Sequence, residues 1–407
     1  MDALLKFNDL HFTMEEDGIK VHLLGSFYFK VPGRELLSIG KFGIKNPNTI
    51  LFHDVEQKKA ELAFNQLLAR CIVDLKNKLF NRPAVYIHKN SHIPLIGTNF
   101  IGIVDRNTTC IEIKPITGCN INCIFCSVDE GIDSRKQVDF IIEKDYLVEE
   151  FNKLASYKSS DFIDIYINSH GEPTTYAPLP ELVASLKSNP KVRTISLITN
   201  GTLLSKSKVD SLVDAGLTRI NLSLNAVTKG PADIAAGTQI NIDYIKNLAE
   251  YICQRCELVI APVYLPGVNE HEIEEIIKFA KSLPAKHRVI VGIQNFMSYS
   301  QGRNPIKSIP MKEFEARLKP LEKKYDISLL SVPEDMQFRM TKPLKKPFKK
   351  NQTINATILT YGRFFSDRLA ASKGRCILIP NCSKEFGSKV RIKITVDKHN
   401  VFYGRVL

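Results

Sequence analysis

The feature that most constrains the fold is a regular alternation of short apolar and amphipathic stretches between residues 108 and 297. The apolar stretches are rich in Ile, Leu and Val and have the length of strands in a buried parallel sheet. Six strands are expected, at residues 110–115, 162–169, 194–200, 219–225, 257–265 and 288–296. Five helices are expected, at residues 143–157, 178–188, 205–216, 243–255 and 269–283. These repeats predict an α/β fold, a partial (β/α)6 barrel of the TIM type, whose functional site gathers at the carboxyl ends of the strands.

A chain of 407 residues is too long for one ordinary core, so several domains are expected. We divide it into residues 1–105, an N-terminal α+β domain with a long helix at 54–80, and residues 106–300, the core. Residues 301–341 are expected to extend the core with a helix and a strand. No apolar run approaches the ~20 residues that span a bilayer. The acidic N-terminal sequence lacks the apolar region of a signal peptide, which predicts a cytoplasmic protein with no membrane partner. The oligomeric state stays open.

Three cysteines, Cys119, Cys123 and Cys126, follow the first predicted strand with the spacing Cys-x3-Cys-x2-Cys. In the reducing compartment expected here, clustered cysteines favour metal binding or catalysis over disulfides. Structural zinc sites take four protein ligands, and catalytic zinc held by three cysteines without a histidine is uncommon outside deaminases. Iron–sulfur clusters prefer thiolates, and three cysteines leave one iron of four open to another ligand. The triplet alone therefore favours a cluster, with three incidental loop cysteines as the alternative.

Four further motifs follow successive predicted strands. They read SHGEPTTY at residues 169–176, TNG at 199–201, NLSLNA at 221–226 and APVYLPGVNE at 261–270. Each alone is an ordinary turn or cap; for example, Asn269 and Glu272 are expected to form a capping box at the next helix. Their order along the chain, after the cysteine triplet, is not expected by chance.

With these motifs, the segment resembles the radical S-adenosylmethionine (SAM) superfamily, although His170 stands where that family usually has a glycine. The resemblance implies a [4Fe–4S] cluster whose fourth iron is chelated by SAM, and a 5′-deoxyadenosyl radical formed when SAM is reduced. It also implies an electron donor such as ferredoxin or flavodoxin. The implied cluster ligands are Cys119, Cys123 and Cys126. The implied SAM contacts are Phe125, Gly171, Glu172, Pro173, Asn200, Ser223, Asn225, Pro266 and Gly267.

Two more cysteines, Cys253 and Cys256, lie just before the fifth predicted strand with the spacing Cys-x2-Cys. A second cluster would need more thiolates, and none of the remaining cysteines, Cys71, Cys110, Cys376 and Cys382, forms an obvious pair with this one. We interpret both as small buried thiols at a helix end, with a second cluster as the alternative.

The positive charge of the chain is concentrated near its C-terminal end. Residues 341–407 carry 15 Lys and Arg against 3 Asp and Glu, a balance of +12 out of +13 for the whole chain. Residues 342–350 predict a basic linker, and residues 351–407 predict a small all-β barrel of the OB type. That barrel resembles a TRAM domain, which occurs at the ends of certain RNA-modifying enzymes. The predicted RNA contacts are Lys345, Lys346, Lys349, Lys350, Arg363, Arg368 and Arg391, with Tyr361, Phe364 and Phe365 suited to base stacking.

We therefore predict a radical SAM enzyme that modifies RNA, tRNA in particular. One alternative is a radical SAM enzyme for a protein, lipid or small molecule, and another is a non-enzymatic iron–sulfur RNA-binding protein. Methylthiolation is disfavoured because residues 1–100 contain only Cys71, whereas methylthiotransferases of this domain pair carry three further cysteines there. The Lys- and Asn-rich composition without Trp is typical of a thermophilic archaeal or AT-rich source.

Overall fold

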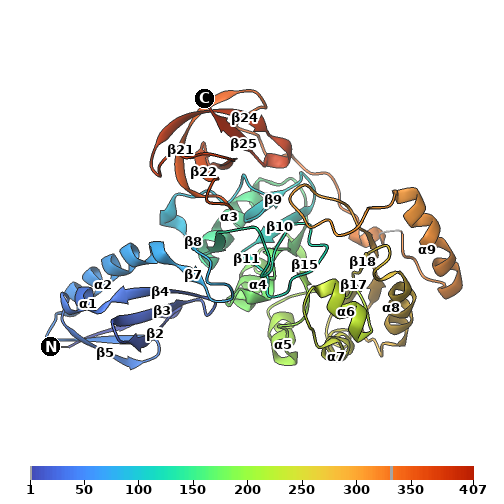
Figure 1. The fold of residues 1–407 in the computed structure, drawn as a ribbon, viewed down its shortest axis with the longest axis horizontal. Coiled ribbons are helices and arrows are strands. Elements are labelled where there is room, and N and C mark those ends of the chain that lie inside the picture. Colours follow the sequence, from blue (N-terminus) through green and yellow to red (C-terminus); the bar gives the residue numbers. More distant parts are fainter. Residues whose placement is uncertain (1, 331–332) are drawn as a thin grey trace.

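The computed structural model, which describes residues 2–330 and 333–407, is built around an open seven-stranded sheet (Figure 1). The strand order is β19-β17-β16-β15-β13-β10-β9. The first six of these run parallel, and β9 pairs antiparallel with β10. Their bounds are β9 Gly102–Asp105, β10 Cys110–Lys114, β13 Ile163–Ile167, β15 Val192–Thr199, β16 Arg219–Leu222, β17 Glu257–Ile260 and β19 Val289–Val291. All six predicted strands are confirmed as β10, β13, β15, β16, β17 and β19. They lie side by side in chain order.

Amphipathic helices connect these strands and cover the sheet. The five predicted ones are confirmed as α3 Lys144–Tyr157, α4 Leu179–Lys187, α5 Lys206–Asp214, α7 Ile242–Ile252 and α8 Glu270–Ser282. The short α6, Lys229–Ala236, was not expected. Helix α7 buries Ile245, Leu248 and Ile252, which lie three or four residues apart on one face.

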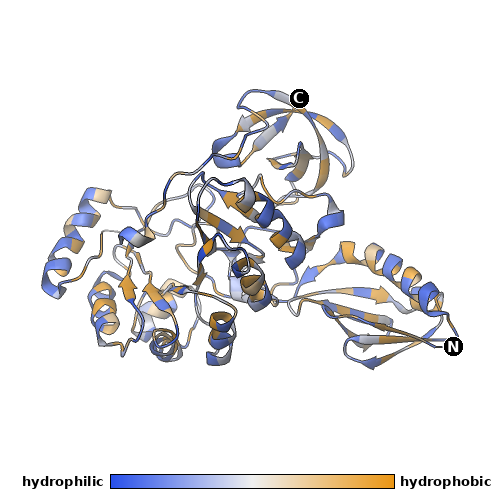
Figure 2. Ribbon diagram, turned by 180° about the vertical axis from the view of Figure 1, so that it is seen from behind, coloured by the Kyte–Doolittle hydropathy of each residue, from blue (hydrophilic) through white to orange (hydrophobic). Residues whose placement is uncertain are grey.

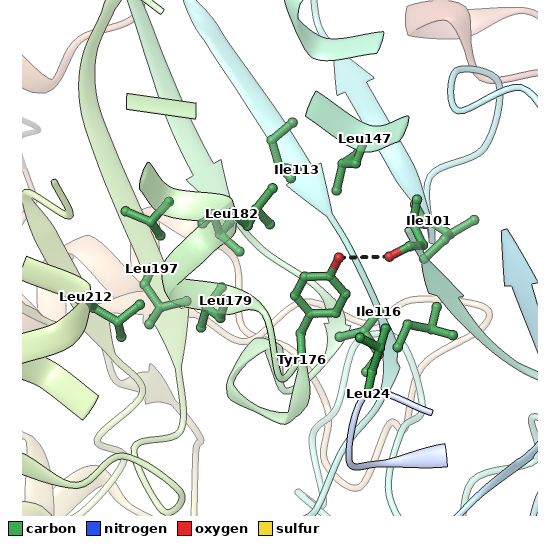
Figure 3. Close-up of a cluster of buried hydrophobic side chains, with 14 of the residues drawn as sticks. Leu24, Ile101, Ile113, Ile116, Leu147, Tyr176, Leu179, Leu182, Leu197 and Leu212 are labelled. Carbon is green, nitrogen blue, oxygen red and sulfur yellow. Dashed lines mark hydrogen bonds between the residues drawn. The ribbon is translucent and has the colours of Figure 1, made fainter. Parts of the chain in front are cut away.

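The centre of the core lies where the sheet meets α3 and α4. Tyr176 is completely buried there, and its hydroxyl donates to the carbonyl oxygen of Ile142 at 2.8 Å (Figure 3). Leucine and isoleucine side chains from several elements surround its ring, including Leu24 of the N-terminal segment (Figure 3). The N-terminal segment and the central sheet therefore share one continuous hydrophobic core.

Short parallel strand pairs extend the sheet beyond its carboxyl edge. They are β11 Thr117–Gly118 with β14 His170–Gly171, and β18 Val263–Tyr264 with β20 Gln294–Asn295. A further parallel pair joins β8 Ala84–Ile87 to β12 Asp139–Ile142. These pairs hold the loops after the main strands in place.

The N-terminal segment forms two antiparallel sheets beside the core (Figure 1). One contains β1 Ala3–Lys6, β6 Thr49–His53 and β5 Lys41–Asn46; the other contains β2 Leu10–Glu15, β3 Gly18–Leu23, β4 Phe27–Pro32 and β7 Lys76–Asn77. The helices are α1 Gly33–Leu37 and α2 Gln57–Cys71. The predicted helix over 54–80 is therefore too long. It ends at Cys71 because the following residues turn back and pair as β7 with β4, a tertiary contact that local periodicity does not reveal.

Residues 301–341 contain helix α9, Met311–Tyr325, as expected. The expected strand is wrong for the described residues of this segment, which form one isolated bridge between Met340 and Thr108 in its place. Residues 331 and 332 lie outside the described part of the chain.

The C-terminal segment closes into a five-stranded barrel in the order β21-β22-β23-β25-β24. Its strands are β21 Thr353–Tyr361, β22 Arg368–Ser372, β23 Arg375–Ile379, β24 Lys389–Val396 and β25 Tyr403–Val406. Residues 342–350 form neither helix nor strand, and Phe348 of this linker is buried against Phe402 with ring centroids 5.3 Å apart. The prediction of a linker followed by a small all-β barrel is confirmed.

Apolar residues line the central strands and the inner faces of the helices, whereas the outer helix faces are polar (Figure 2). In the part of the chain that the structure describes, no helix is long and apolar enough to cross a membrane.

Candidate active site

The three cysteines lie on the loop that leaves β11, above the carboxyl edge of the sheet. All three thiols are free and half-buried. Burial raises the pKa of the Cys119 thiol well above its ordinary value, and it raises the pKa of Cys123 to about 12 and that of Cys126 in the same direction. A metal centre would hold these groups as thiolates, which burial alone disfavours.

Arg303, which the sequence analysis missed, lies far from the cysteines in the chain but binds directly to the loop that carries them, the cluster loop. Its Nη1 donates to the carbonyl oxygens of Asn122 and Cys123 at 2.8 and 3.1 Å, and its Nε donates to Asp129 Oδ1 at 2.9 Å. Asp129 is buried and also accepts from Arg135 at 2.8 Å. No motif surrounds Arg303 in the sequence, so only the tertiary structure reveals its role.

The Gly-Glu-Pro turn lies directly against the start of the cluster loop. Gly171 pairs with Gly118 across β11 and β14, and it has a φ of +142°. A Cβ atom at Gly171 would lie 2.0 Å from the Gly118 carbonyl oxygen, so this position requires glycine. Pro173 is buried at the start of the 3-10 turn that follows.

Glu172 is a buried carboxylate that links two loops. Its Oε1 accepts from the Thr174 and Thr199 hydroxyls at 2.6 and 2.7 Å, and its Oε2 accepts from the Asn200 amide at 2.9 Å. Burial raises the pKa of Glu172, and these hydrogen bonds oppose the rise. Glu172 therefore positions the Thr-Asn-Gly loop beside the cysteines.

Asn200 on that loop approaches Cys119 most directly. Its Nδ2 lies 3.8 Å from the Cys119 sulfur and donates to Asn120 Oδ1 at 3.0 Å. The side-chain amide is thus held within reach of a thiolate at this position.

Hydrogen bonds of asparagine side chains join the loop after β16 to β18 and to the loop that follows β18. Asn225 Oδ1 accepts from the Val263 amide at 2.9 Å, and Asn269 Nδ2 donates to the Asn225 carbonyl oxygen at 2.8 Å. The expected capping box at α8 is wrong, because Asn269 is turned into the loops and makes no side-chain cap hydrogen bond. Glu272 instead accepts from the Val227 amide and the Thr228 hydroxyl at 2.7 and 2.6 Å.

These loops enclose a cavity of about 270 Å³ that starts at Cys123 and Cys126. Among the residues predicted to contact SAM, those on its wall are Phe125, Gly171, Glu172, Asn200, Ser223 and Asn225. Pro173, Pro266 and Gly267 do not line it; the last two lie on the outer part of the loop between β18 and α8. Gln294, Phe296, Met297 and Tyr299, which follow β19, also line the cavity. The sequence analysis placed Gln294 and Phe296 in the last predicted strand, and it missed Met297 and Tyr299.

The three cysteines Cys119, Cys123 and Cys126 fit an iron–sulfur cluster better than a single metal ion. Within the described residues, no three Cys, His, Asp or Glu side chains converge closely enough to share one metal ion. A four-iron cluster instead bonds each thiolate to a different iron, which spreads the sulfur atoms apart. An amide donor within 4 Å of one sulfur, Asn200 Nδ2, suits a cluster because hydrogen bonds to the sulfurs tune its potential.

Cys253 and Cys256 lie away from this site, in the hydrophobic core. Both are buried, and the Cys253 thiol donates to the Glu250 carbonyl oxygen at 3.2 Å. They occupy the position that we expected for small buried thiols.

The C-terminal barrel docks on the core beside the cluster loop. The amides of Cys376 and Phe402 donate to the carbonyl oxygens of Ile96 and Gly97 at 2.9 and 2.8 Å. Gly97 has a φ of +141°, and a Cβ atom there would lie 2.1 Å from the Cys376 carbonyl oxygen. The barrel is therefore packed closely against the core.

One of the predicted RNA contacts, Arg363, is wrong. Its side chain is buried between the barrel and the core, with Nη1 2.5 Å from Glu130 Oε1 and Nη2 3.2 Å from Asp139 Oδ1. Burial raises the pKa of Glu130 to about 7, and the charge of Arg363 opposes the rise. Arg363 is thus a docking residue, because a buried and doubly paired guanidinium is not available to RNA on the surface.

The other predicted RNA contacts lie on the outside of the linker and barrel. Arg368 is half-buried, and its guanidinium lies over the rings of Tyr361 and Phe386, 4.8 and 5.3 Å from their centroids. The exposed cations are Lys345, Lys346, Lys349, Lys350 and Arg391.

Comparison with known proteins agrees with this site. A family model described as the Radical SAM superfamily matches residues 113–280. An uncharacterized protein of Methanocaldococcus jannaschii is 33% identical over 362 residues, which cover 82% of this chain and 83% of that protein. A probable GTP 3′,8-cyclase of Pyrococcus abyssi is 26% identical over 238 residues, 58% of this chain and 72% of that protein. Among solved structures, SuiB of Streptococcus suis bound to S-adenosylmethionine matches with a TM-score of 0.43 and 14% identity, over 79% of this chain and 70% of SuiB.

Proposed function

The chain belongs to the radical SAM superfamily of enzymes, and from this premise we propose that it modifies RNA, with tRNA as the first substrate to test. The observation that carries the proposal is the docking of the basic C-terminal barrel on the cluster loop, through Arg363 and Glu130. Nucleic acid bound to that barrel would lie beside the reacting centre. We assign the barrel to the TRAM type because a closed five-stranded barrel fits the resemblance of residues 351–407 to that domain.

Enzymes of this superfamily use a [4Fe–4S] cluster and SAM, and they need an electron donor. We assign three irons to Cys119, Cys123 and Cys126, and SAM to the 270 Å³ cavity beside them. When bound, the cluster and SAM supply a 5′-deoxyadenosyl radical. Phe125 and Phe296, which belong to one apolar cluster and line the cavity, exclude water from that space, as radical chemistry requires.

The lysines of the linker supply the proposed phosphate contacts. Lys345, Lys349 and Lys350 are exposed, and Lys346 is exposed with Asp397 at 3.7 Å as its carboxylate neighbour. A row of exposed cations on an extended segment suits a phosphate backbone, because each neutralised phosphate releases counterions.

An aromatic group on the barrel surface supplies the proposed base contacts. Tyr361 makes edge contacts with Phe365 and Phe386, with ring centroids 5.4 and 4.8 Å apart. Phe365 and Phe386 are 43% and 48% exposed, which leaves apolar rings facing solvent beside Arg368. Exposed rings next to an arginine are typical of surfaces that stack single-stranded bases.

RNA binding is tested by fluorescence anisotropy with labelled tRNA over a range of salt concentrations. We expect the variant with four of the linker lysines, Lys345, Lys346, Lys349 and Lys350, changed to Ala to bind at least tenfold more weakly. The slope of log K against log salt should become shallower by about 3, since each phosphate contact contributes about 0.7–0.9. The matched control variant changes four exposed lysines of α2 and α9 to Ala: Lys58, Lys59, Lys312 and Lys319. This control should bind tRNA as the wild type does. Equal loss in both variants, or no tRNA binding by the wild type, contradicts the RNA assignment.

The modification itself is tested by mass spectrometry of tRNA nucleosides from cells with and without the gene. A nucleoside that is lost on deletion and restored by the wild type, but not by a Cys123→Ala variant, supports the proposal. Identical nucleoside profiles refute it for tRNA.

A second candidate substrate is a free purine nucleotide. It is favoured by the similarity to proteins named GTP 3′,8-cyclase, over 58% of this chain in the example above. Formation of 5′-deoxyadenosine that is stimulated by GTP, and not by tRNA, would select this candidate.

A further inference from the structure

A second and larger cavity, of about 600 Å³, lies next to the proposed SAM cavity. The two share Ser127 on the cluster loop, Asn168 after β13 and Tyr299 after β20 as wall residues. A molecule in the larger cavity would therefore be separated from the SAM cavity by these side chains alone. Its volume is within the usual range for small-molecule sites.

The C-terminal barrel forms one wall of this larger cavity. Phe364, Asp367, Leu378 and Tyr403 of the barrel line it together with Arg363. The opposite wall comes from the segments that flank β9, from β10 and from the loop after β13. The cavity therefore exists only because the barrel is docked on the core.

Most of the charged groups on the walls are already paired with a group of opposite charge. Arg106 and Lys114 share one carboxylate, Glu112, at 2.7 and 2.9 Å. Arg363 is neutralised by Glu130 and Asp139. Asp367, the other carboxylate on the wall, accepts from the Asn381 amide at 3.3 Å and the Ser366 hydroxyl at 3.2 Å.

Lys136 is the cation on the walls that has no ion-pair partner in the described part of the chain, although Glu130 and Asp129 lie near enough to act on its charge. It is 7% exposed and lines the cavity. Its Nζ lies 4.5 Å from the centroid of the Phe364 ring, and no carboxylate of residues 2–330 or 333–407 lies within ion-pair distance of it. A buried ammonium without a counter-ion is costly, so an anionic ligand in the cavity would stabilise it.

Polar groups with unused hydrogen-bonding capacity face the same space. The hydroxyl of Ser169 is buried and has no hydrogen-bond partner in the described part of the chain. His170 lines the cavity beside it, and burial, followed by the nearby charge of Lys114, lowers its pKa well below the ordinary value. A neutral ring at His170 can still donate one hydrogen bond to an anion.

We propose that this cavity binds a nucleoside phosphate, the unit on which the enzyme acts, with the phosphate at Lys136 and Ser169. The nucleoside would extend toward Tyr299 and the wall shared with the SAM cavity. This inference rests on the proposed function for its choice of a nucleoside, and it applies both to a nucleotide of RNA and to a free nucleotide.

The test measures binding to the full-length protein by isothermal titration calorimetry. The probes are the four common ribonucleoside 5′-monophosphates, their nucleosides, and a 5′-phosphorylated triribonucleotide. We expect at least one monophosphate or the trinucleotide to bind the wild type. Lys136→Met should weaken that binding about tenfold to a hundredfold, because a hydrogen bond to a charged group contributes about 1.5–3 kcal/mol. Its nucleoside affinity should stay within about twofold, since the nucleoside carries no phosphate.

The controls separate the cavity from the linker. Lys345→Met removes a lysine of the linker surface and should weaken tRNA binding without changing monophosphate binding. Lys136→Arg should restore most of the monophosphate affinity. If Lys136→Met fails to fold, Ser169→Ala replaces it, with an expected loss of about threefold to tenfold.

The results distinguish this inference from the proposed function. If no phosphate probe binds, or if Lys136→Met and Ser169→Ala bind as the wild type does, the inference is wrong even when tRNA binding through the linker lysines holds. If the monophosphates bind through Lys136 but cells without the gene have unchanged tRNA nucleosides, the pocket stands and the RNA substrate is wrong.

Discussion

Replacing Arg363 with Ala tests how the C-terminal barrel is held on the core. In the wild type, the guanidinium is 5% exposed and pairs with Glu130 and Asp139, which are 1% and 0% exposed. Its Nε also donates to the carbonyl oxygen of Val138 at 2.8 Å. The variant would leave two carboxylates buried at the interface without their cation.

The expected loss of docking free energy follows from the burial of Arg363 and its two carboxylate partners. Removing one partner of a buried ion pair costs about 3–5 kcal/mol, because the remaining charge stays desolvated. Asp139 keeps Asn77 and Thr117 as hydrogen-bond donors at 3.0 and 3.2 Å, whereas no hydrogen bond to the Glu130 carboxylate remains in the described structure. We therefore expect most of the cost to arise at Glu130, four residues after the last cysteine of the cluster loop.

Hydrogen exchange followed by mass spectrometry measures the effect where it arises. The amides of Gln137 and Val138 donate to the Arg363 carbonyl oxygen at 2.8 and 3.2 Å, so they report docking directly. A loss of about 3–5 kcal/mol should speed their exchange by about a hundredfold to a thousandfold or more. Arg405→Ala, an exposed residue of the same barrel, is the matched control and should leave these amides unchanged. Equal protection in the Arg363→Ala variant and the wild type would refute the docking role.

Three more predictions concern the cluster loop and its neighbours. Changing Cys119, Cys123 or Cys126 to Ala should abolish four-iron absorbance after reconstitution, while tRNA affinity should stay within about twofold of the wild type. An intact cluster in any of these variants would contradict the ligand assignment. Gly171→Ala should disrupt the β11–β14 pair, because its Cβ atom would lie 2.0 Å from the Gly118 carbonyl oxygen. SAM binding measured by equilibrium dialysis should therefore fall at least tenfold. The control variant Gly230→Ala, at a position with open space around it, should bind SAM normally. Arg303→Ala should lower stability by about 1–3 kcal/mol and speed the loss of iron to a chelator, since Asp129 keeps only Arg135 and two loop carbonyl oxygens lose the Arg303 donor. An unchanged rate of iron loss would show that the contacts of Arg303 are dispensable.

Several details of the site lay beyond local sequence signals for a physical reason. Lys136 and Glu130 look like ordinary charged residues of a loop, and only the docking of the barrel buries them. Arg363 looks like a surface cation of a basic segment, yet the same docking removes it from solvent. Asn269 has the local signature of a helix cap, but hydrogen bonds across the loops compete successfully for its side chain.

The sequence alone determined the parallel sheet, the cysteine loop at its carboxyl edge and the separate basic barrel. These follow from periodicity, spacing and composition, which are local properties that every residue carries with it. The tertiary structure alone decided which predicted residues face the cavity, where the N-terminal helix ends, and how the barrel sits beside the cluster loop. Those outcomes depend on contacts between residues far apart in the chain, such as Arg363 with Glu130, whose free energy no local pattern records.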